Sequence, residues 1–201
     1  MRHILLSMSV IAVFFSSHSY AEEMHHNMPS EAQMQKMMMI GTPSDAHKVL
    51  ESLVGKWTYK MSFRTSPDMP EQMSSGESEN QWILGGRQLK QNFSGAFDMG
   101  GQTHAYNGIG YIGHDNLKNK YTSIWMDNMT TATMIAHGTY NAETKTITET
   151  GAHTCAMQGK EVKFKSEMKI IDADHYSYIM HDLSSADKPF KSMDIQFTRQ
   201  K

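Results

Sequence analysis

The chain has 201 residues, which is enough for one domain or at most two small ones. Hydrophobic residues make up 39% and charged residues 20%, which excludes a disordered chain, and a mean hydropathy of -0.53 excludes a multi-span membrane protein. The formal charge is only -2, so no excess of positive charge exists to bind a phosphate backbone, and nucleic acid is not expected as a partner.

The first 21 residues have the pattern of a secretory signal peptide. Met1–His3 is a short basic start, residues 4–15 are mostly apolar, and Ser19–Ala21 places small residues where a signal peptidase cleaves. The apolar run is too short to span a membrane, and no Cys follows it to carry a lipid anchor. The sequence predicts cleavage near Ala21 and a periplasmic or secreted protein without an integral membrane span.

Residues 22–43 are rich in Met and His and show no strand alternation, so they are predicted to form a flexible tail. Ser30 could instead cap a short helix that places Met34, Met37 and Met38 on one side. Thioethers suit Cu(I) and imidazoles suit Cu(II), so the tail is a candidate copper site. The candidate ligands are Met24, His25, His26 and Met28, with Met37, Met38 and Met39 in addition. The alternative is a tail that stays unstructured, or folds onto apolar surface, and binds no metal.

The next segment has the start and stop signals of a helix. Thr42–Asp45 offers a cap, a proline for the first helical position and an acidic residue in the first turn. The apolar positions that follow share one face: Val49, Leu50, Leu53 and Val54. Gly55 tolerates the left-handed conformation that ends many helices. The sequence therefore predicts one helix of about three turns over residues 43–54.

After Gly55 the chain alternates between apolar and polar residues with a period of two. Trp57, Tyr59, Met61 and Phe63 alternate with polar side chains, and residues 162–170 and 193–199 repeat the pattern. Turn residues separate these runs into about ten strands of regular spacing. Because no helical pattern lies between the strands, we expect an antiparallel up-and-down β-barrel over residues 44–201.

Five sequence blocks in this segment resemble a known family. They are residues 47–57, 83–87, 108–116, 123–127 and 138–140. In this order they resemble the bacterial domain-of-unknown-function family 1579, and Gly55 and Trp57 resemble the start of a lipocalin-like (calycin) barrel. The resemblance covers about residues 45–201, with His114 where an aromatic residue is expected. It implies a lipocalin-like fold but no established chemistry. It also implies that Arg199 covers Trp57 at one barrel end, so Gly55, Trp57 and Arg199 are expected to be structural.

A barrel of this size encloses space for side chains or for one small ligand. Large aromatic and polar side chains are therefore candidates to line an internal pocket. They are Asn80, Trp82, Gln91, Tyr106, Trp125, Asp127, His137, Tyr176 and Tyr178. The alternative is that the aromatic side chains fill the barrel as core.

Cys155 is the only cysteine of the chain, so no intrachain disulfide can form. It is expected to be either a small buried side chain or a metal-binding or redox thiol. His153, Cys155 and Met157 are spaced by two, which on a continuous strand places all three on one face as an alternative copper site. The turn residues that follow Met157 could prevent this convergence.

The sequence contains none of the short motifs that mark common hydrolases, phosphate-binding loops or dinucleotide sites. A binding module is therefore favoured over an enzyme. We expect an exported protein that holds a small, largely apolar molecule inside a barrel. The alternatives are a copper-handling protein that uses the tail, an uncharacterised hydrolase, and, if side chains fill the barrel, an interaction role for its outer surface.

Overall fold

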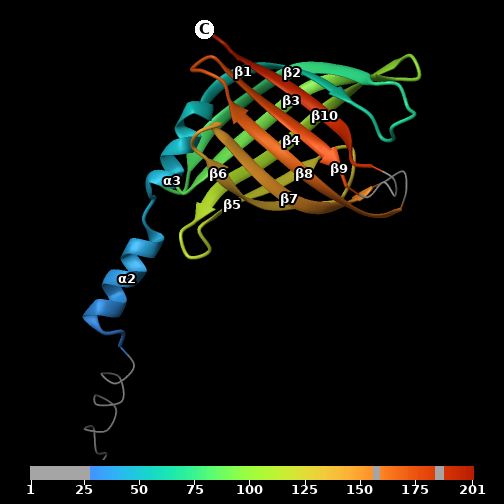
Figure 1. The fold of residues 1–201 in the computed structure, drawn as a ribbon. Helices are drawn as coiled ribbons and strands as arrows, with labels where there is room; N and C mark the ends of the chain where they lie inside the picture. Colours follow the sequence, from blue (N-terminus) through green and yellow to red (C-terminus); the bar gives the residue numbers. More distant parts are fainter. Residues whose placement is uncertain (1–27, 156–158, 184–187) are drawn as a thin grey trace, which may run out of the picture. The chain divides into compact units, whose positions relative to one another are not determined.

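A closed barrel of ten antiparallel strands dominates the computed structural model, which describes residues 28–155, 159–183 and 188–201 (Figure 1). The strands are β1 (Gly55–Phe63), β2 (Gln72–Ile83), β3 (Gln88–Met99), β4 (Gln102–Asp115), β5 (Lys120–Asp127), β6 (Met134–Asn141), β7 (Thr146–Cys155), β8 (Lys160–Ile170), β9 (His175–Asp182) and β10 (Phe190–Arg199). Each strand pairs with its neighbours in the sequence, and β1 pairs with β10 to close the barrel. The predicted up-and-down barrel of about ten strands is confirmed.

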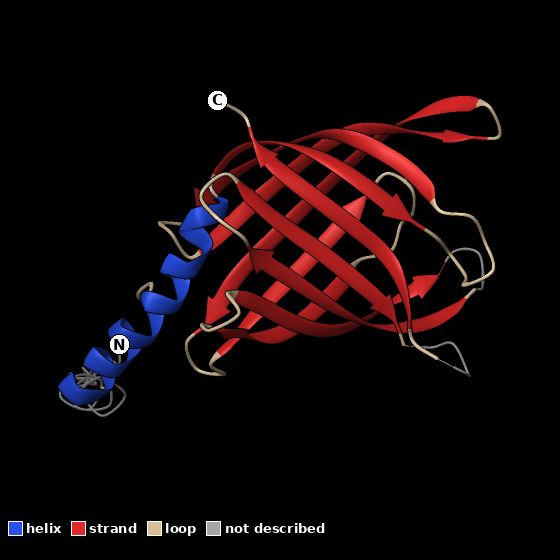
Figure 2. Ribbon diagram, turned by 45° about the horizontal axis from the view of Figure 1, so that its top comes forward, coloured by secondary structure: helices blue, strands red, loops and turns tan. Residues whose placement is uncertain are grey.

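Strands β1 and β10, which close the barrel, bring the two ends of the barrel segment together. Trp57 on β1 faces Arg199 on β10, and the register continues without a shift to Phe63 opposite Met193. Figure 2 shows the tilt of the strands around the closed barrel. Closure pairs the first and last strands, so neither presents the fully open outer edge that favours strand-to-strand aggregation.

Alternation of side chains divides every strand between an inner and an outer face. Along β1, Trp57, Tyr59 and Met61 are buried, while Thr58 and Lys60 are exposed. On β8, Val162, Phe164, Ser166 and Met168 are buried, and the lysines between them lie outside or partly outside. The apolar positions of the period-two pattern in the sequence are therefore the side chains that point into the barrel.

A short helical segment closes one end of the barrel. It consists of helix α3 (Asp45–Lys48) and the 3-10 helix η1 (Val49–Leu53). Leu50 and Leu53 are fully buried in the core cluster that also contains Trp57. The hydroxyl of Tyr121 donates a hydrogen bond to the carbonyl of Ala46 at 2.7 Å, which ties the segment to the barrel wall. This end of the barrel is thus filled by apolar side chains.

The predicted continuous helix over residues 43–54 is corrected in two respects. The α-helix begins after Ser44, so Pro43 precedes the cap, and it changes to a 3-10 helix at Val49. The tighter helix places Leu50 and Leu53, three residues apart, on the same side of the segment. Gly55 does adopt a positive φ of 120°, but it does so as the first residue of β1, after Val54 has already become extended.

Helix α2 (Glu31–Gly41) lies within the segment predicted as a tail. It is the short helix that the Ser30 cap allowed. The Ser30 hydroxyl accepts a hydrogen bond from the backbone N–H of Gln33 at 3.2 Å, and the Ser30 N–H donates to the Gln33 side chain at 2.7 Å. The predicted signal peptide, its cleavage site and residues 22–27 lie outside the described residues.

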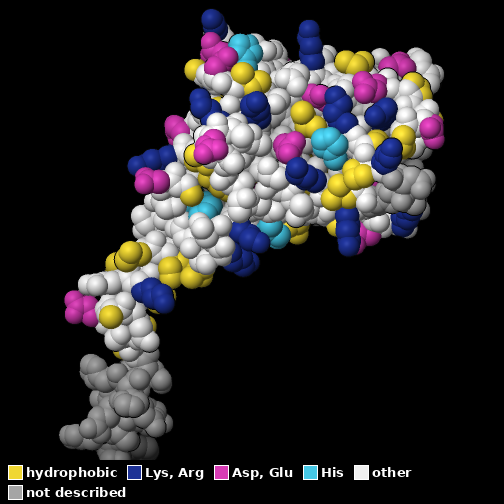
Figure 3. All heavy atoms as spheres, in the orientation of Figure 1, with side chains coloured by type: hydrophobic (Ala, Val, Ile, Leu, Met, Phe, Trp, Pro, Cys, Tyr) yellow, Lys and Arg dark blue, Asp and Glu magenta, His cyan; other side chains and the backbone are white. Residues whose placement is uncertain are grey.

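The face of the molecule in Figure 3 carries Lys, Arg, Asp and Glu side chains of both signs, interspersed over the barrel strands. This mixture agrees with the near-zero net charge of the sequence. Among the helices that the structure describes, none has the length and apolar character needed to cross a membrane.

Candidate functional site

A cavity of about 340 Å³ lies inside the barrel. Most of its lining is aromatic or aliphatic and includes Phe93, Trp125, Phe164, Met168, Met180 and Phe197. Three exposed threonines also line it: Thr65 after β1, Thr130 after β5 and Thr154 near the end of β7. These positions lie at the end of the barrel opposite α3 and η1, so the cavity reaches solvent at that end.

Trp125 on β5 forms part of the cavity wall because two glycines on β4 leave room for its ring. In the register of the two strands, Gly110 faces Trp125 and Gly108 faces Asp127. A Cβ atom at Gly110 would lie 3.1 Å from Trp125 Cε3, and one at Gly108 would clash with the indole. The ring of Phe93 packs edge-on against Trp125 at a centroid distance of 4.9 Å. The indole is therefore held flat against β4 beside the open space.

Asp127 fixes both the indole and the adjacent loop at the mouth of the cavity. The Trp125 Nε1–H donates to Asp127 Oδ2 at 3.1 Å. The other carboxylate oxygen accepts the backbone N–H groups of Met129 and Thr130, at 3.0 and 3.3 Å. Burial raises the pKa of the nearby Tyr106 hydroxyl above its usual value, so this lining group stays neutral.

Glu149 is the most deeply buried carboxyl of the cavity wall. It projects inward from β7 and is 2% exposed. The hydroxyl of Ser123, on β5, lies 2.8 and 2.9 Å from its two carboxylate oxygens and donates to them. Burial raises the pKa of Glu149 to about 7, and the Ser123 hydrogen bond opposes this shift only in part. The carboxyl therefore changes its charge close to neutral pH.

Six of the nine side chains predicted to line a pocket do line the cavity. They are Gln91, Tyr106, Trp125, Asp127, Tyr176 and Tyr178. The other three lie elsewhere. Asn80 points inward but donates to the carbonyl of Leu53 at 2.8 Å, at the closed end of the barrel. Trp82 donates its Nε1–H to Glu51 at 2.6 Å, beside η1. His137 is exposed on the outer face of β6 and contacts Thr122.

Several lining residues were missed by the sequence analysis, and Glu149 and Ser123 are the most important. A signal for Glu149 was present, because it lies two residues after the apolar Ile147 and so shares its inward face. A single charged residue between two threonines resembles a solvent-facing position, however. Ser123 has the same ambiguity, since a small hydroxyl side chain occurs on either face of a sheet.

His153 and Cys155 do share one face of β7, and both line the cavity. Burial lowers the pKa of His153, so its imidazole is neutral at neutral pH. Cys155, predicted as either a small buried side chain or a metal-binding or redox thiol, is a free thiol of intermediate burial. Met157, the third member of the predicted metal set, lies outside the described residues.

The predicted tail site for copper falls largely outside the described residues, which exclude Met24, His25 and His26. Met28 is described and is 70% exposed, and Met37, Met38 and Met39 are exposed on α2. Within residues 28–155, 159–183 and 188–201, no cluster of three or more His, Cys, Asp or Glu side chains is arranged to hold a metal ion. Copper binding by the tail stays a prediction.

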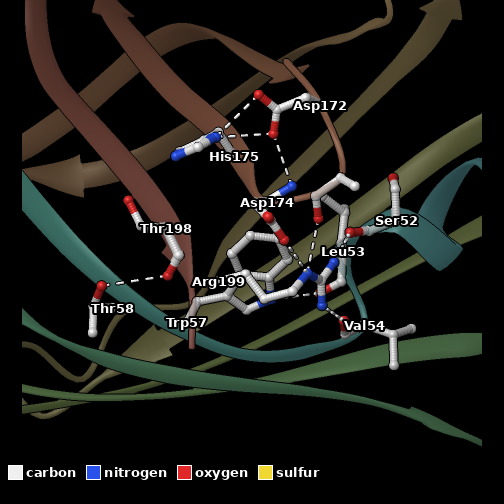
Figure 4. Close-up of polar contacts among 11 residues, drawn as sticks. Ser52, Leu53, Val54, Trp57, Thr58, Asp172, Asp174, His175, Thr198 and Arg199 are labelled. Atoms are coloured by element: carbon white, nitrogen blue, oxygen red, sulfur yellow. Dashed lines mark hydrogen bonds and ion pairs between the residues drawn. The ribbon is translucent and has the colours of Figure 1, made fainter. Parts of the chain in front are cut away.

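Arg199 and Trp57 contact each other and the backbone at the closed end of the barrel (Figure 4). The Arg199 guanidinium lies 4.0 Å from the centre of the Trp57 ring. It also donates to the carbonyls of Val54 at 2.6 Å, Ser52 at 2.8 Å and Ala173 at 2.8 Å. The Trp57 Nε1–H donates to Leu53 at 2.9 Å. Arg199 thus covers Trp57, as the resemblance implied, and both side chains also join η1 to the barrel.

The barrel is similar to solved structures of low sequence identity. A crystal structure of Rv2717c from M. tuberculosis superposes with a TM-score of 0.60 at 17% identity, covering 80% of this chain and 100% of that chain. A redesigned beta barrel gives a TM-score of 0.37 at 14% identity, covering 78% of this chain and 96% of that one. The first likeness supports the fold, and the second is too weak to carry an argument.

No curated protein matches the chain. The model of one protein family does match, over residues 42–199, and it is described as a protein of unknown function (DUF1579). The match spans the closing helical segment and all ten strands. This chain is therefore a member of the DUF1579 family.

Proposed function

We propose that the barrel binds a small, largely apolar molecule in its internal cavity. The observation that carries the proposal is the cavity of about 340 Å³, which is lined mainly by aromatic and aliphatic side chains and reaches solvent at one end. Ligand pockets in proteins begin at about 300 Å³, and an apolar cavity of about 150 Å³ already accepts benzene. A barrel built only for stability would fill this volume, because each void of that kind costs packing energy.

The two ends of the barrel differ in the way that a binding protein requires. Leu50, Leu53 and the Trp57–Arg199 pair close one end, while three exposed threonines mark the other. A ligand would enter at the threonine end and rest between Phe93, Trp125 and Met180. Rigid aromatic rings lose little conformational entropy when they contact a ligand, which favours affinity.

The proposed setting is the periplasm or the outside of the cell, after removal of residues 1–21. The support is the signal-peptide pattern of the sequence alone. Mass measurement of the protein isolated from its native cells tests the proposal. A mature chain that begins at Glu22 is expected, and a chain that retains residues 1–21 would contradict export with cleavage.

Native mass spectrometry of the protein, purified without denaturation from its own cells, tests ligand binding. A bound small molecule is expected to add a discrete mass that denaturation releases. Ala136→Phe, which fills the cavity from β6, should abolish the added mass. Ala105→Phe, on the exposed outer face of β4, should retain it and serves as the matched control. An added mass that Ala136→Phe leaves unchanged would place the ligand outside the cavity.

A further inference from the structure

Among the residues that the structure describes, none supplies a counter-charge to the buried carboxyl of Glu149. Its hydrogen bonds come from the hydroxyl of Ser123. Among the described residues, no Lys, Arg or His forms an ion pair with it. One hydroxyl proton satisfies only part of a carboxylate that can accept about four hydrogen bonds. A buried charge of this kind is costly unless a partner of opposite sign is supplied.

In the described part of the chain, the strands packed around Glu149 contribute no Lys or Arg side chain to the cavity lining. In the strand register it lies between Gly138 on β6 and Ser166 on β8. On the cavity wall, Tyr178 on β9 interacts electrostatically with Glu149, and His153 lies four residues further along β7. Burial raises the pKa of Tyr178 to about 12 and lowers that of His153, so both are neutral at neutral pH.

The charged side chains of the described cavity lining are all acidic. It contains two carboxyl side chains, Asp127 and Glu149, and no Lys or Arg. Asp127 is already engaged by the Trp125 indole and two backbone N–H groups, whereas Glu149 is engaged by a single hydroxyl. A ligand carboxylate or phosphate would therefore enter a cavity that offers it repulsion and no cationic partner.

We propose that the ligand is an apolar amine, whose protonated nitrogen pairs with Glu149 while its hydrocarbon part packs against Phe93, Trp125 and the other aromatic lining residues. This inference rests on the proposed function and specifies the ligand class of the same cavity. A protonated amine supplies the missing counter-charge and further N–H donors for the carboxylate. The faces of aromatic rings also attract a cation within about 6 Å of the ring centre.

Proton linkage gives the proposal a characteristic pH dependence. The ammonium group of an alkyl amine titrates above about pH 10, so it remains charged at neutral pH. Glu149, with a pKa of about 7, is mostly protonated at pH 6 and mostly ionised at pH 8. Binding at pH 6 must therefore first remove a proton from Glu149, which lowers the apparent affinity about tenfold relative to pH 8.

Three probes of similar size and different charge test the proposal: phenylbutylamine, phenylbutanol and phenylbutyrate. Their affinities for the full-length protein are measured by isothermal titration calorimetry at pH 6 and pH 8. At pH 8 the amine is expected to bind at least about tenfold more tightly than the alcohol, and the acid more weakly than both. Between pH 8 and pH 6 the amine should weaken about tenfold and the alcohol by less than about twofold.

The variant Glu149→Gln keeps the shape of the side chain and removes its charge. It should bind amine and alcohol with affinities within about twofold of each other, and without the pH dependence. The control Glu167→Gln makes the same change on β8 outside the cavity and should retain the preference for the amine. Thermal unfolding verifies that both variants are folded.

The outcomes separate the two proposals. If the alcohol binds as tightly as the amine in the unmodified protein, or if Glu149→Gln keeps the preference, the amine proposal is overturned while binding of a small apolar molecule stands. If none of the three probes binds, both proposals are overturned. If phenylbutyrate binds most tightly, the charge argument is wrong.

Discussion

The guanidinium of Arg199 lies 4.0 Å above the ring of Trp57 and also donates hydrogen bonds to three backbone carbonyls. Two of these carbonyls belong to Ser52 and Val54, at the end of η1. The pair thus joins the first and last strands to the helical segment that closes the barrel. The guanidinium of Arg199 is planar and carries several N–H donors in a fixed arrangement, and the ammonium group of a lysine has neither property.

Arg199→Lys is expected to reduce the free energy of unfolding by about 2–3 kcal/mol, because a single ammonium cannot satisfy the carbonyls of Ser52, Val54 and Ala173 together. Urea unfolding followed by circular dichroism measures the change. A loss below about 0.5 kcal/mol would show that the positive charge alone, rather than the fork of donors, stabilises this end.

Gly55→Ala tests the backbone that passes beneath Arg199. Gly55 has φ of 120°, and an added Cβ would lie 2.6 Å from Nη1 of Arg199. Gly100 also has a positive φ, of 65°, but an added Cβ there would meet no atom within 4 Å. We expect Gly55→Ala to cost about 2–4 kcal/mol and Gly100→Ala about 1 kcal/mol, since φ of 120° strains an alanine more than φ of 65°, and only the first substitution also displaces Arg199. Equal losses in urea unfolding would mean that neither the φ of Gly55 nor its contact with Arg199 adds to the cost.

Glu149 should make the stability of the protein depend on pH. Its pKa is raised from 4.5 to about 7 by burial, so the folded state binds more protons than the unfolded state between these values. The stabilising contribution of the protonated form is fully present below pH 4.5 and is lost as pH rises through about 7. At pH 8 the loss amounts to about 3 kcal/mol.

The measurement compares unfolding free energies of the unmodified protein and Glu149→Gln between pH 5 and pH 8. Because glutamine does not titrate, the variant should gain about 2–3 kcal/mol relative to the unmodified protein over this range. A difference that is independent of pH would contradict a buried, titrating Glu149.

The tail prediction concerns copper. Replacement of both His25 and His26 by Ala in the full-length chain is expected to remove about one equivalent of bound Cu(II), because thioethers bind Cu(I) in preference. Below about pH 6.5 protonation of these imidazoles should weaken Cu(II) binding in the unmodified protein as well. Calorimetry with Cu(II) measures both effects. If Cys155→Ser removes the metal and the double variant does not, the site lies on the face of His153 and Cys155 instead.

The sequence predicts the barrel well because alternation is a local signal. Each strand repeats apolar side chains every second residue, and the burial of Trp57, Tyr59 and Met61 against exposed Thr58 and Lys60 follows that period. The helical segment was less predictable. Its change to a 3-10 helix at Val49 depends on how Leu50 and Leu53 fit the barrel end, which no local pattern records.

The residues that line the cavity could be predicted only in part, because the same period-two alternation was the only signal for them. Period two gives the face of a residue but not its depth along the barrel, so Asn80 was assigned to the pocket although it lies at the closed end. On β6 even the face was ambiguous. Ala136 points inward and Ile135 outward, the reverse of their apolar size, and the exposed His137 lies on the same outer face as Ile135.

The most direct test of binding inside the barrel is a crystal structure of the protein soaked with bromophenylbutanol, located by the anomalous signal of bromine. A neutral probe tests the cavity independently of Glu149. We predict one strong bromine site inside the barrel, in contact with Phe93, Trp125 or Met180, with the backbone of the ten strands unchanged. Bromine sites found only on the outer surface, or a barrel interior filled by rearranged side chains, would contradict the account.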